Sequence, residues 1–381
     1  MHIFLSAGEP SGDLHAANLA RELLKHFPDA KLVGLGGDKM AAAGVRLRYP
    51  LTELAVMWLG KALARLPDFL RIVRQSEQYF RTEKPDAVVV IDYPGFHFSL
   101  AKRAHRAGIP VYYFVPPQLW AWAGWRVSKM RRWVKCVLTA LPFEETWYRE
   151  RGVTTHYIGH PYFDELRREV PDATHVAALR AAGTPIVALL PGSRTQEVLS
   201  NVPLMLQAAD RIRQAVPGVR FHVAAYRNKH AAQIREMLAG SSLPVEVHVR
   251  RTPEILEASD AVLAVSGSVA LEMLYRLKPS VIVYRISPAF GVVARQLVTT
   301  RFICLVNLLA DRQLFPEFPT TRDNPDELAA PIVTWLTSPE AHAATVAELR
   351  ALRERVAVPG ACARAAAFLA GELRQQAGSG V

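Results

Sequence analysis

The sequence predicts an α/β protein of two doubly wound, Rossmann-like halves followed by a helical C-terminal segment. Short runs rich in Val, Ile and Leu alternate with longer helical patterns along the chain. Most of these runs are apolar at every position, which is typical of parallel strands covered by helices on both faces. The alternation restarts after "IGHPYFDEL", which marks the domain junction. Ligands are expected at the carboxyl ends of the strands, in a cleft between the halves.

Each expected strand is one of these apolar runs. The first half contains "HIFLSA", "KLVGLG", "DAVVVID", "PVYYFV", "CVLTAL" and "THYIG". The second half contains "PIVALLPG", "VRFHVAA", "VEVHV", "DAVLAV" and "SVIVYR". From about residue 324 the pattern is helical. We therefore expect domains at 1–163 and 164–340, with helices at 341–381 packing back on the first domain.

The composition indicates a basic, globular protein. Of 381 residues, 50% are hydrophobic and 21% are charged. The net charge of +11 favours an anionic partner, such as nucleic acid, a phosphorylated substrate or an acidic membrane surface. The three cysteines form no CxxC pair, which argues against a disulfide framework or a simple zinc cluster. Without a signal-like leader or a long uncharged apolar run, we expect a cytoplasmic protein with no transmembrane helix.

The loop after the first expected strand, "SAGEPSGDLHAANLA", leads into a helix. A glycine-containing loop at a helix N-terminus can bind phosphate through its backbone amides. This loop carries two carboxylates, Glu9 and Asp13, which would repel an anion. It is therefore either a nucleotide loop of unusual charge or a pocket for a ligand rich in hydroxyl groups.

The strongest local motif of the second half is "PIVALLPGSRTQEV". Gly192 allows a close approach of the backbone, and Ser193 and Arg194 offer a hydroxyl group and a bidentate cation. These groups suit a diphosphate, although an ordinary strand-to-helix turn with a surface arginine has the same sequence.

"DAVLAVSGSVALEMLYR" repeats the design, with a tight turn of Ser266, Gly267 and Ser268 before a helix. Glu272, one turn into that helix, can accept two vicinal ribose hydroxyls or act as a capping-box carboxylate. Two such loops in one domain favour a nucleotide diphosphate there.

Asp92 ends the buried run of "DAVVVIDYPGFHF". Apolar surroundings raise the pKa of a carboxyl group toward that of a useful general base. Capping of the following loop is the simpler alternative. Nearby, "FVPPQLWAWAGWRVSKMRRW" mixes tryptophans with basic residues, which suits single-stranded nucleic acid, sugar stacking beside phosphate, or core packing.

The stretch "LAVMWLGKALARLPDFLRIVR" contains more apolar residues than one core-facing helix stripe needs. A helix that packs on the core explains its main stripe. The additional apolar residues beside arginines are typical of an interfacial membrane segment. The expected membrane patch consists of Val56, Trp58, Leu59, Leu63, Leu66 and Phe69.

Taken in order, these motifs resemble the lipid-A-disaccharide synthase family of GT-B glycosyltransferases. The matching stretches are "SAGEPSGD", "GLGGDKM", "ELAVMWL", "IDYPGF", "PPQLWAW", "LPFEETWY", "YIGHP", "LLPGSRTQEV", "SGSVALEML", "VYRISP" and "NLLADR". They cover nearly the whole chain to about residue 318. The resemblance implies transfer from UDP-2,3-diacylglucosamine to 2,3-diacylglucosamine 1-phosphate, forming a β-1,6 linkage with inversion and releasing UDP.

The resemblance also assigns roles to residues. Asp92 takes the position of the base, and Arg194 and Asn307 match residues tied to activity. The expected donor-binding residues are Gly192, Ser193, Ser266, Gly267, Ser268, Glu272 and Arg285. The expected acceptor-binding residues, which engage sugar hydroxyls, are Glu9, Ser11 and Asp13. The opening loop then belongs to the acceptor half.

The implied enzyme needs neither a metal ion nor another cofactor and binds no nucleic acid. It acts as a peripheral protein on the cytoplasmic face of the inner membrane, and the resemblance suggests a homodimer that exchanges C-terminal helices. The chain departs from the family's patterns at Gly95, His97 and Pro319.

Three rival functions are weaker. A UDP-N-acetylglucosamine-dependent transferase or epimerase leaves the apolar surplus unused. An NAD-dependent oxidoreductase lacks its G-x-G-x-x-G loop. A nucleic-acid-binding function does not explain the two loops, around Gly192 and Gly267, that suit a diphosphate.

Overall fold

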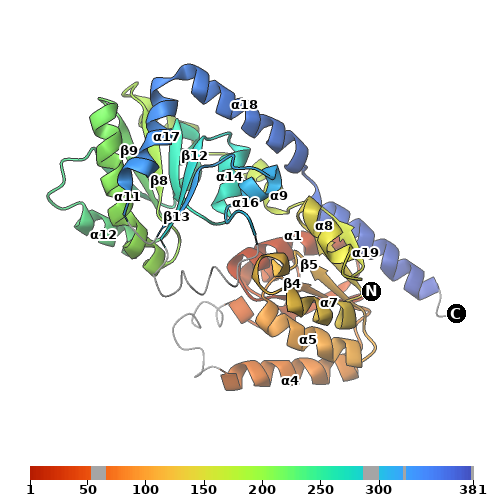
Figure 1. The fold of residues 1–381 in the computed structure, drawn as a ribbon. Coiled ribbons are helices and arrows are strands. Elements are labelled where there is room, and N and C mark those ends of the chain that lie inside the picture. The colour runs from red at the N-terminus through yellow and green to blue at the C-terminus, as the bar shows by residue number, and fades with distance from the viewer. Residues whose placement is uncertain (53–65, 286–299, 321–322, 379–381) are drawn as a thin grey trace. The chain divides into compact units, whose positions relative to one another are not determined.

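The computed structural model describes residues 1–52, 66–285, 300–320 and 323–378. The chain divides into two compact units (Figure 1). Unit 1 comprises Met1–Asp164 and the chain from Val358 onward, and unit 2 comprises Glu165–Ala357. Each unit contains one parallel sheet with helices on both faces.

The sheet of unit 1 has the strand order β3-β2-β1-β4-β5-β6-β7. All of its strand pairs are parallel. Its strands are β1 (His2–Ala7), β2 (Lys31–Leu35), β3 (Arg46–Tyr49), β4 (Ala87–Ile91), β5 (Val111–Phe114), β6 (Cys136–Thr139) and β7 (Thr155–Tyr157). Its helices are α1 (Pro10–His26), α2 (Asp38–Ala42), α4 (Leu66–Glu83), α5 (Pro94–Arg106), α6 (Leu119–Trp122), the 3₁₀ turn η2 (Gly124–Arg126), α7 (Val127–Trp133), α8 (Pro142–Arg149) and α19 (Ala361–Gly378).

Both faces of this sheet are apolar because each is covered by helices. On one face, Val88 and Val90 of β4 share a core with Phe80 of α4. On the other face, Val89 shares a core with Leu19 of α1 and with residues of α19. Burial on both sides explains why the strands are apolar at every position.

The sheet of unit 2 has the order β10-β9-β8-β11-β12-β13, again parallel throughout. Its strands are β8 (Ile186–Leu190), β9 (Arg220–Ala225), β10 (Val245–Val249), β11 (Ala261–Val265), β12 (Ser280–Arg285) and β13 (Glu317–Thr320). Its helices are α10 (Ala173–Arg180), α11 (Thr195–Ala215), α12 (Asn228–Met237), α13 (Thr252–Ala258), α14 (Val269–Tyr275), α16 (Leu305–Ala310), α17 (Pro325–Thr337) and α18 (Pro339–Val356). Helix α9 (Tyr162–Arg168) contains the junction of the two units.

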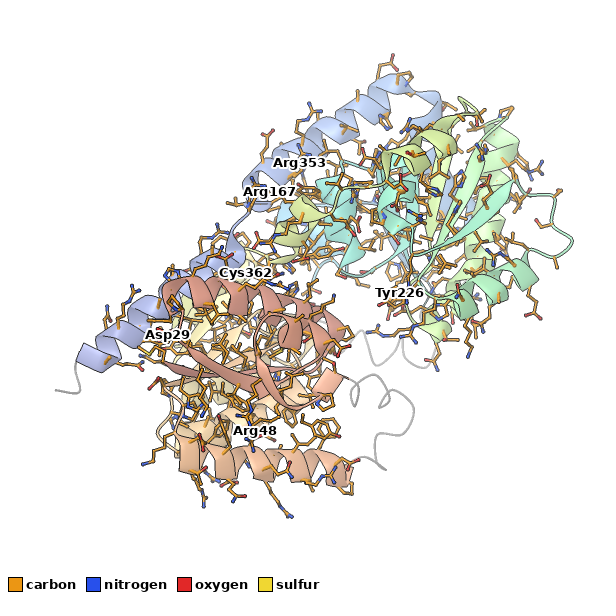
Figure 2. The ribbon with its side chains drawn as sticks, turned by 180° about the vertical axis from the view of Figure 1, so that it is seen from behind. Asp29, Arg48, Arg167, Tyr226, Arg353 and Cys362 are labelled. Atoms are coloured by element: carbon orange, nitrogen blue, oxygen red, sulfur yellow. The ribbon has the colours of Figure 1, made fainter. Side chains whose placement is uncertain are left out.

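The two C-terminal helices belong to different units. Helix α18 lies in unit 2, whereas α19 lies in unit 1 and packs along α1. Asp164 fixes the start of α19, because its carboxylate accepts the backbone N–H groups of Gly360 and Cys362. Figure 2 labels Cys362, which lies in the first turn of α19. The stretch Pro339–Gly378 is long and apolar enough to cross a membrane by composition. Since α18 and α19 bury residues in the two units, we interpret them as core helices.

Every strand predicted from the sequence is present, and the described residues contain two further strands that were not predicted. Both lie at sheet edges, where a strand needs no continuous apolar run. β3 alternates arginines with half-buried residues, and β13 contains Pro319. Proline is tolerated at an edge because no second neighbour needs its N–H.

Candidate active site

In unit 1, the loop after β1 and the loop after β4 lie next to each other at the carboxyl ends of their strands. Both were expected on the acceptor side. Strands β1 and β4 are neighbours, and the order of the sheet reverses between them. Ligands of doubly wound proteins bind at such a switch point. The ring of Tyr93, which follows β4, packs directly on Gly8, which follows β1. A Cβ at Gly8 would lie only 2.2 Å from this ring, so the contact requires glycine.

Asp92 follows β4 in an unusual backbone conformation. Asp92 and Tyr93 have φ values of +49° and +48°, in the left-handed region. The carbonyl oxygen of Asp92 accepts hydrogen bonds from His97 Nδ1 and from the Tyr113 hydroxyl, both at 2.6 Å. His97 Nε2 lies 2.9 Å from Ser6 Oγ. Since a carbonyl can only accept, Nδ1 of His97 carries the proton and Nε2 accepts from Ser6.

The carboxyl group of Asp92 is suited to proton transfer near neutral pH. Burial, with a smaller contribution from the charge of Glu9, raises its pKa to about 6. The side chain is only half-buried, so a ligand can reach it. A carboxylate with this pKa is ionised at pH 7 and is more basic than an ordinary aspartate.

A second buried carboxyl group, Glu144, was not predicted. It accepts hydrogen bonds from Trp120 Nε1 at 3.0 Å and from the backbone N–H groups of Ala140 and Leu141, both at 3.1 Å. Burial raises its pKa to about 7 despite these bonds, and the charge of Asp92 adds to the effect. Glu144 is the third residue of α8 and caps the start of that helix, but Leu141 at the N-cap lacks the polar side chain of a capping box, so the sequence carried no such signal.

The opening loop divides into exposed and structural residues. Glu9 and Ser11 are exposed, as acceptor contacts require. Asp13 is buried, and its carboxylate accepts the backbone N–H groups of Gly37 at 2.8 Å, Lys39 at 3.1 Å and Met40 at 3.2 Å. It therefore caps α2, which corrects the expectation that it offers its carboxylate to a sugar.

In unit 2, the loop after β8 is closed by Glu197, to which the sequence analysis gave no role. Its carboxylate accepts the N–H groups of Ser193 and Arg194, both at 3.1 Å, and the Arg194 guanidinium at 2.8 Å. Gly192 has a φ of +106°, and a Cβ there would lie 2.5 Å from Glu197 Oε2. The protein's own carboxylate thus occupies the amides expected to bind the diphosphate.

The turn after β11 lies beside this loop, since β8 and β11 are neighbouring strands. It consists of Ser266, Gly267 and Ser268, the last two exposed, and α14 begins at the next residue. Glu272 is buried and accepts from Arg276 Nε at 3.0 Å, so the carboxylate lies in an ion pair. Arg285 ends β12 and pairs with Asp323 at 2.9 Å. The roles of Glu272 and Arg285 in donor binding stay predictions.

Asn307 is fully buried in α16. Its Nδ2 donates to the Phe315 carbonyl at 2.7 Å and to the Glu317 carboxylate at 3.1 Å. Its Oδ1 accepts the N–H groups of Leu314 and Phe315, both at 2.8 Å. Asn307 therefore holds the segment 314–317 against α16, and its role in the reaction stays a prediction.

The expected membrane patch is described only in part. Four of its residues lie outside the described ranges: Val56, Trp58, Leu59 and Leu63. Leu66 begins α4. Phe69 is half-buried, and its ring lies 5.7 Å from that of Phe96 and 6.4 Å from that of Tyr93. Phe69 therefore contributes to the core of unit 1.

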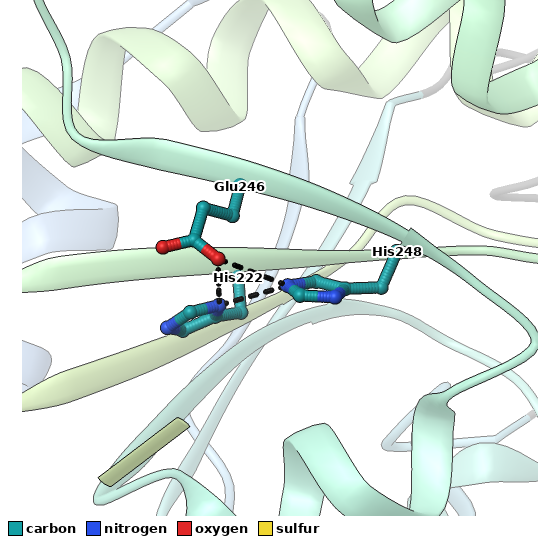
Figure 3. Close-up of side chains that lie close together, drawn as sticks. All are labelled: His222, Glu246 and His248. Carbon is teal, nitrogen blue, oxygen red and sulfur yellow. Dashed lines mark hydrogen bonds and ion pairs between the residues drawn. The ribbon is translucent and has the colours of Figure 1, made fainter. Parts of the chain in front are cut away.

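Three side chains of unit 2 could ligate a metal ion (Figure 3). His222 Nδ1 and His248 Nε2 are 3.0 Å apart, and Glu246 Oε2 lies 3.9 and 3.7 Å from them. A hydrogen bond between the two histidine rings accounts for the distance of 3.0 Å without a metal ion. Glu246 also forms an ion pair with Arg220. The group lies on β9 and β10, whereas the donor loops follow β8 and β11. We therefore assign it no part in the reaction.

Comparison with known proteins identifies the family. The profile of the family described as lipid-A-disaccharide synthetase matches residues 3–366. A lipid-A-disaccharide synthase of Anaeromyxobacter dehalogenans strain 2CP-C is 36% identical over 373 residues, 98% of this chain and 97% of the relative. The chain belongs to the lipid-A-disaccharide synthase family. The synthase of Pseudomonas putida strain KT2440 is 39% identical over 315 residues, 83% of this chain and 84% of that protein.

Solved structures confirm the GT-B-like fold of the synthase. UDP-N-acetylglucosamine 2-epimerase from Neisseria meningitidis, bound to UDP-GlcNAc, has a TM-score of 0.65 at 12% identity, covering 98% of this chain and 100% of that one. MurG of Acinetobacter baumannii has a TM-score of 0.59 at 15% identity, covering 96% and 98%. At these identities the likeness extends to the fold alone. The synthase is a glycosyltransferase of lipid A biosynthesis, and its substrates are lipid A precursors.

Proposed function

We propose that the synthase transfers diacylglucosamine from UDP-2,3-diacylglucosamine to the 6-hydroxyl of 2,3-diacylglucosamine 1-phosphate. The acceptor oxygen attacks C1 of the donor from the face opposite UDP. Its proton passes to the carboxylate of Asp92, and the bond from C1 to the diphosphate oxygen breaks with its electron pair leaving on UDP. A single displacement at C1 inverts the configuration and gives the β-1,6 linkage.

The observation that carries the proposal is the half-buried carboxyl group of Asp92 at the switch point of unit 1. With a pKa of about 6 it is ionised at neutral pH and is basic enough to assist proton removal. Such assistance contributes ~10²–10⁴-fold to a reaction. Glu9, the N-cap of α1, and Ser11, in the first turn of α1, are exposed and are proposed to bind acceptor hydroxyls.

On the donor side, the proposed ligand of Arg194 and of the start of α11 is the diphosphate of UDP. A charge-assisted hydrogen bond of this kind contributes about 1.5–3 kcal/mol. UDP must displace Glu197 from the amides of Ser193 and Arg194. We propose that this arginine and these amides replace a divalent ion, so that EDTA leaves turnover unchanged.

The synthase is proposed to act as a peripheral protein on the cytoplasmic face of the inner membrane, because its substrates carry acyl chains. Exposed aromatic side chains support this proposal. Trp122 is 45% exposed and Trp125 is 65% exposed, and the guanidinium of Arg126 lies 5.2 and 5.7 Å from their rings. Flotation with anionic vesicles tests membrane binding, and light scattering tests the proposed homodimer.

Incubation with both diacyl sugars tests the reaction directly. We expect a disaccharide monophosphate by mass spectrometry, one UDP for each disaccharide, and a β-anomeric coupling constant by NMR. A product with the α configuration would contradict direct displacement. Absence of the disaccharide would contradict the substrate assignment.

A further inference from the structure

A basic hollow lies in unit 1, next to the segment that carries Asp92. It has a volume of about 280 Å³ and is formed by α5, η2 and α7. Pro94 and Gly95, which follow Asp92 and Tyr93 directly, form part of its wall. Four cationic side chains also line it: Lys102, Arg103, Arg126 and Lys129.

Three of these cations have no acidic partner among the described residues. Arg103 pairs with Glu77 at 3.2 Å. For Lys102, Arg126 and Lys129, no carboxylate of the described residues lies within ion-pair distance. Like charges gathered in one hollow repel one another, so an arrangement of this kind is stabilised by a bound anion.

Aromatic rings hold the unpaired cations in place. Lys102 Nζ lies 5.7 Å from the ring of Trp133, and Lys129 Nζ lies 5.3 Å from that of Phe98. Cation–π contacts of this length restrict the side chains without neutralising their charge. The hollow therefore offers several fixed N–H donors to a compact ligand with several acceptor oxygens, which describes a phosphate monoester.

We propose that this hollow binds the phosphate group of the acceptor sugar. The inference rests on the proposed function, in which the acceptor is a sugar 1-phosphate and Asp92 receives the proton of its 6-hydroxyl. Because Pro94 and Gly95 connect the hollow to Asp92 within three residues, a phosphate bound there lies on the same side of unit 1 as the base. The phosphate would thereby select the acceptor and orient its hydroxyl.

The experiment is calorimetric titration of the full chain with short-chain diacylglucosamine 1-phosphate and with the same sugar lacking phosphate. The titration contains no donor, so no turnover occurs. Lys102→Ala/Lys129→Ala and Arg126→Ala are expected to weaken binding of the phosphorylated sugar at least tenfold and to leave binding of the dephosphorylated sugar unaffected. Arg132→Ala, which changes an exposed residue of α7 outside the hollow, is the control and should bind normally.

An unchanged affinity of both hollow variants for the phosphorylated sugar would overturn the proposal. So would an equal loss for both sugars. A phospholipid headgroup offers the same phosphate chemistry, so vesicles of phosphatidylglycerol form the second arm. If the variants lost vesicle binding and kept sugar binding, the acceptor assignment would be wrong. Failure of the proposed function differs, because the unaltered hollow would then bind neither sugar.

Discussion

At the scale of the residue, two side chains hold the backbone of Asp92 in place. Two consecutive residues in the left-handed region cost about 1–3 kcal/mol each, which the surrounding structure must offset. His97 and Tyr113 do so by donating to the same carbonyl oxygen, and Ser6 holds the ring of His97 in place by donating to its Nε2. These contacts fix where the carboxylate points.

Asp92→Asn should reduce kcat by about 10²–10⁴-fold, because the amide cannot accept the proton. The affinity for UDP should stay unchanged, because Asp92 lies in unit 1 and the donor loops lie in unit 2. Since the pKa of Asp92 is about 6, activity of the unaltered enzyme should fall below this pH. Kinetics between pH 5 and 8, with UDP titration, measure both effects.

Glu9→Gln provides the control. The charge of Glu9 contributes to the raised pKa of Asp92, so its removal should move the acidic limb of the pH profile to lower pH. Two results would show that another residue is the base. One is an acidic limb of the pH profile that does not move in Glu9→Gln, and the other is an equally steep acidic limb in Asp92→Asn.

His97→Ala tests whether the base depends on its backbone support. Loss of the Nδ1–H donor frees the carbonyl of Asp92, and misplacement of a catalytic group can cost ~10²-fold in rate. We expect kcat to fall while the affinity for UDP is retained. His97→Asn keeps a donor group and should restore part of kcat. Equal kcat in His97→Ala and the unaltered enzyme would show that Tyr113 alone suffices.

At the scale of the element, the succession of strand, loop and helix was predictable from the sequence. Which side chains bind the backbone N–H groups of the loops was not. The sequence indicates where polar residues follow a strand. It does not distinguish a carboxylate that meets a ligand from one that caps a helix, because both need the same residue at the same place. Asp13 and Glu197 proved to bind backbone N–H groups, and this depends on chain segments that only the fold brings near.

Arg194→Ala should weaken UDP binding about 10–100-fold, the loss of one charge-assisted contact to phosphate. The fold should persist, because the guanidinium is exposed and its partner Glu197 lies only three residues further on, in the first turn of α11. Arg211→Ala, which removes an exposed arginine further along α11, is the control. UDP-induced shifts in Tm compare the two, and an unchanged shift in Arg194→Ala would place the diphosphate elsewhere.

For the segment leading into α4, the two aromatic residues of the expected membrane patch should behave differently. Phe69→Ser should reduce the free energy of unfolding by about 1–3 kcal/mol, because the ring packs on Phe96 and Tyr93. Trp58→Ser should weaken vesicle flotation without changing stability if the patch docks on the membrane. Loss of stability in Trp58→Ser with flotation unchanged would assign Trp58 to the core as well.

At the scale of the whole molecule, both units contain buried ionisable groups. Some of these groups lower the free energy of unfolding as the pH falls, and others raise it. Burial lowers the pKa of several histidines of the described residues, most strongly that of His160, to about 3, and those of His15, His97 and His222, to about 4. Burial also raises the pKa of carboxyl groups, most strongly those of Asp92, to about 6, and Glu144, to about 7. The sequence shows these residues but not their burial, so their effect on stability follows from the fold.

The net effect should be a loss of stability on acidification. Between pH 6.5 and 4 the unfolded chain protonates the histidines while the folded protein keeps them neutral, so each contributes a loss as pH falls. The two carboxyl groups act oppositely, because the folded protein protonates them before the unfolded chain does. Each proton of difference changes the free energy of unfolding by about 1.4 kcal/mol per pH unit, and the histidines outnumber the carboxyl groups.

Urea unfolding at pH 7 and pH 5 measures this loss, and two variants should change it in opposite directions. His222→Gln removes a group that loses stability on acidification, so the difference between the two pH values should shrink. Asp92→Asn removes a group that gains stability on acidification, so the difference should grow. The same variant should be more stable than the unaltered protein at pH 8, where the ionised Asp92 is buried at a cost. Changes of the same sign in both variants would show that these two groups do not govern the acid response.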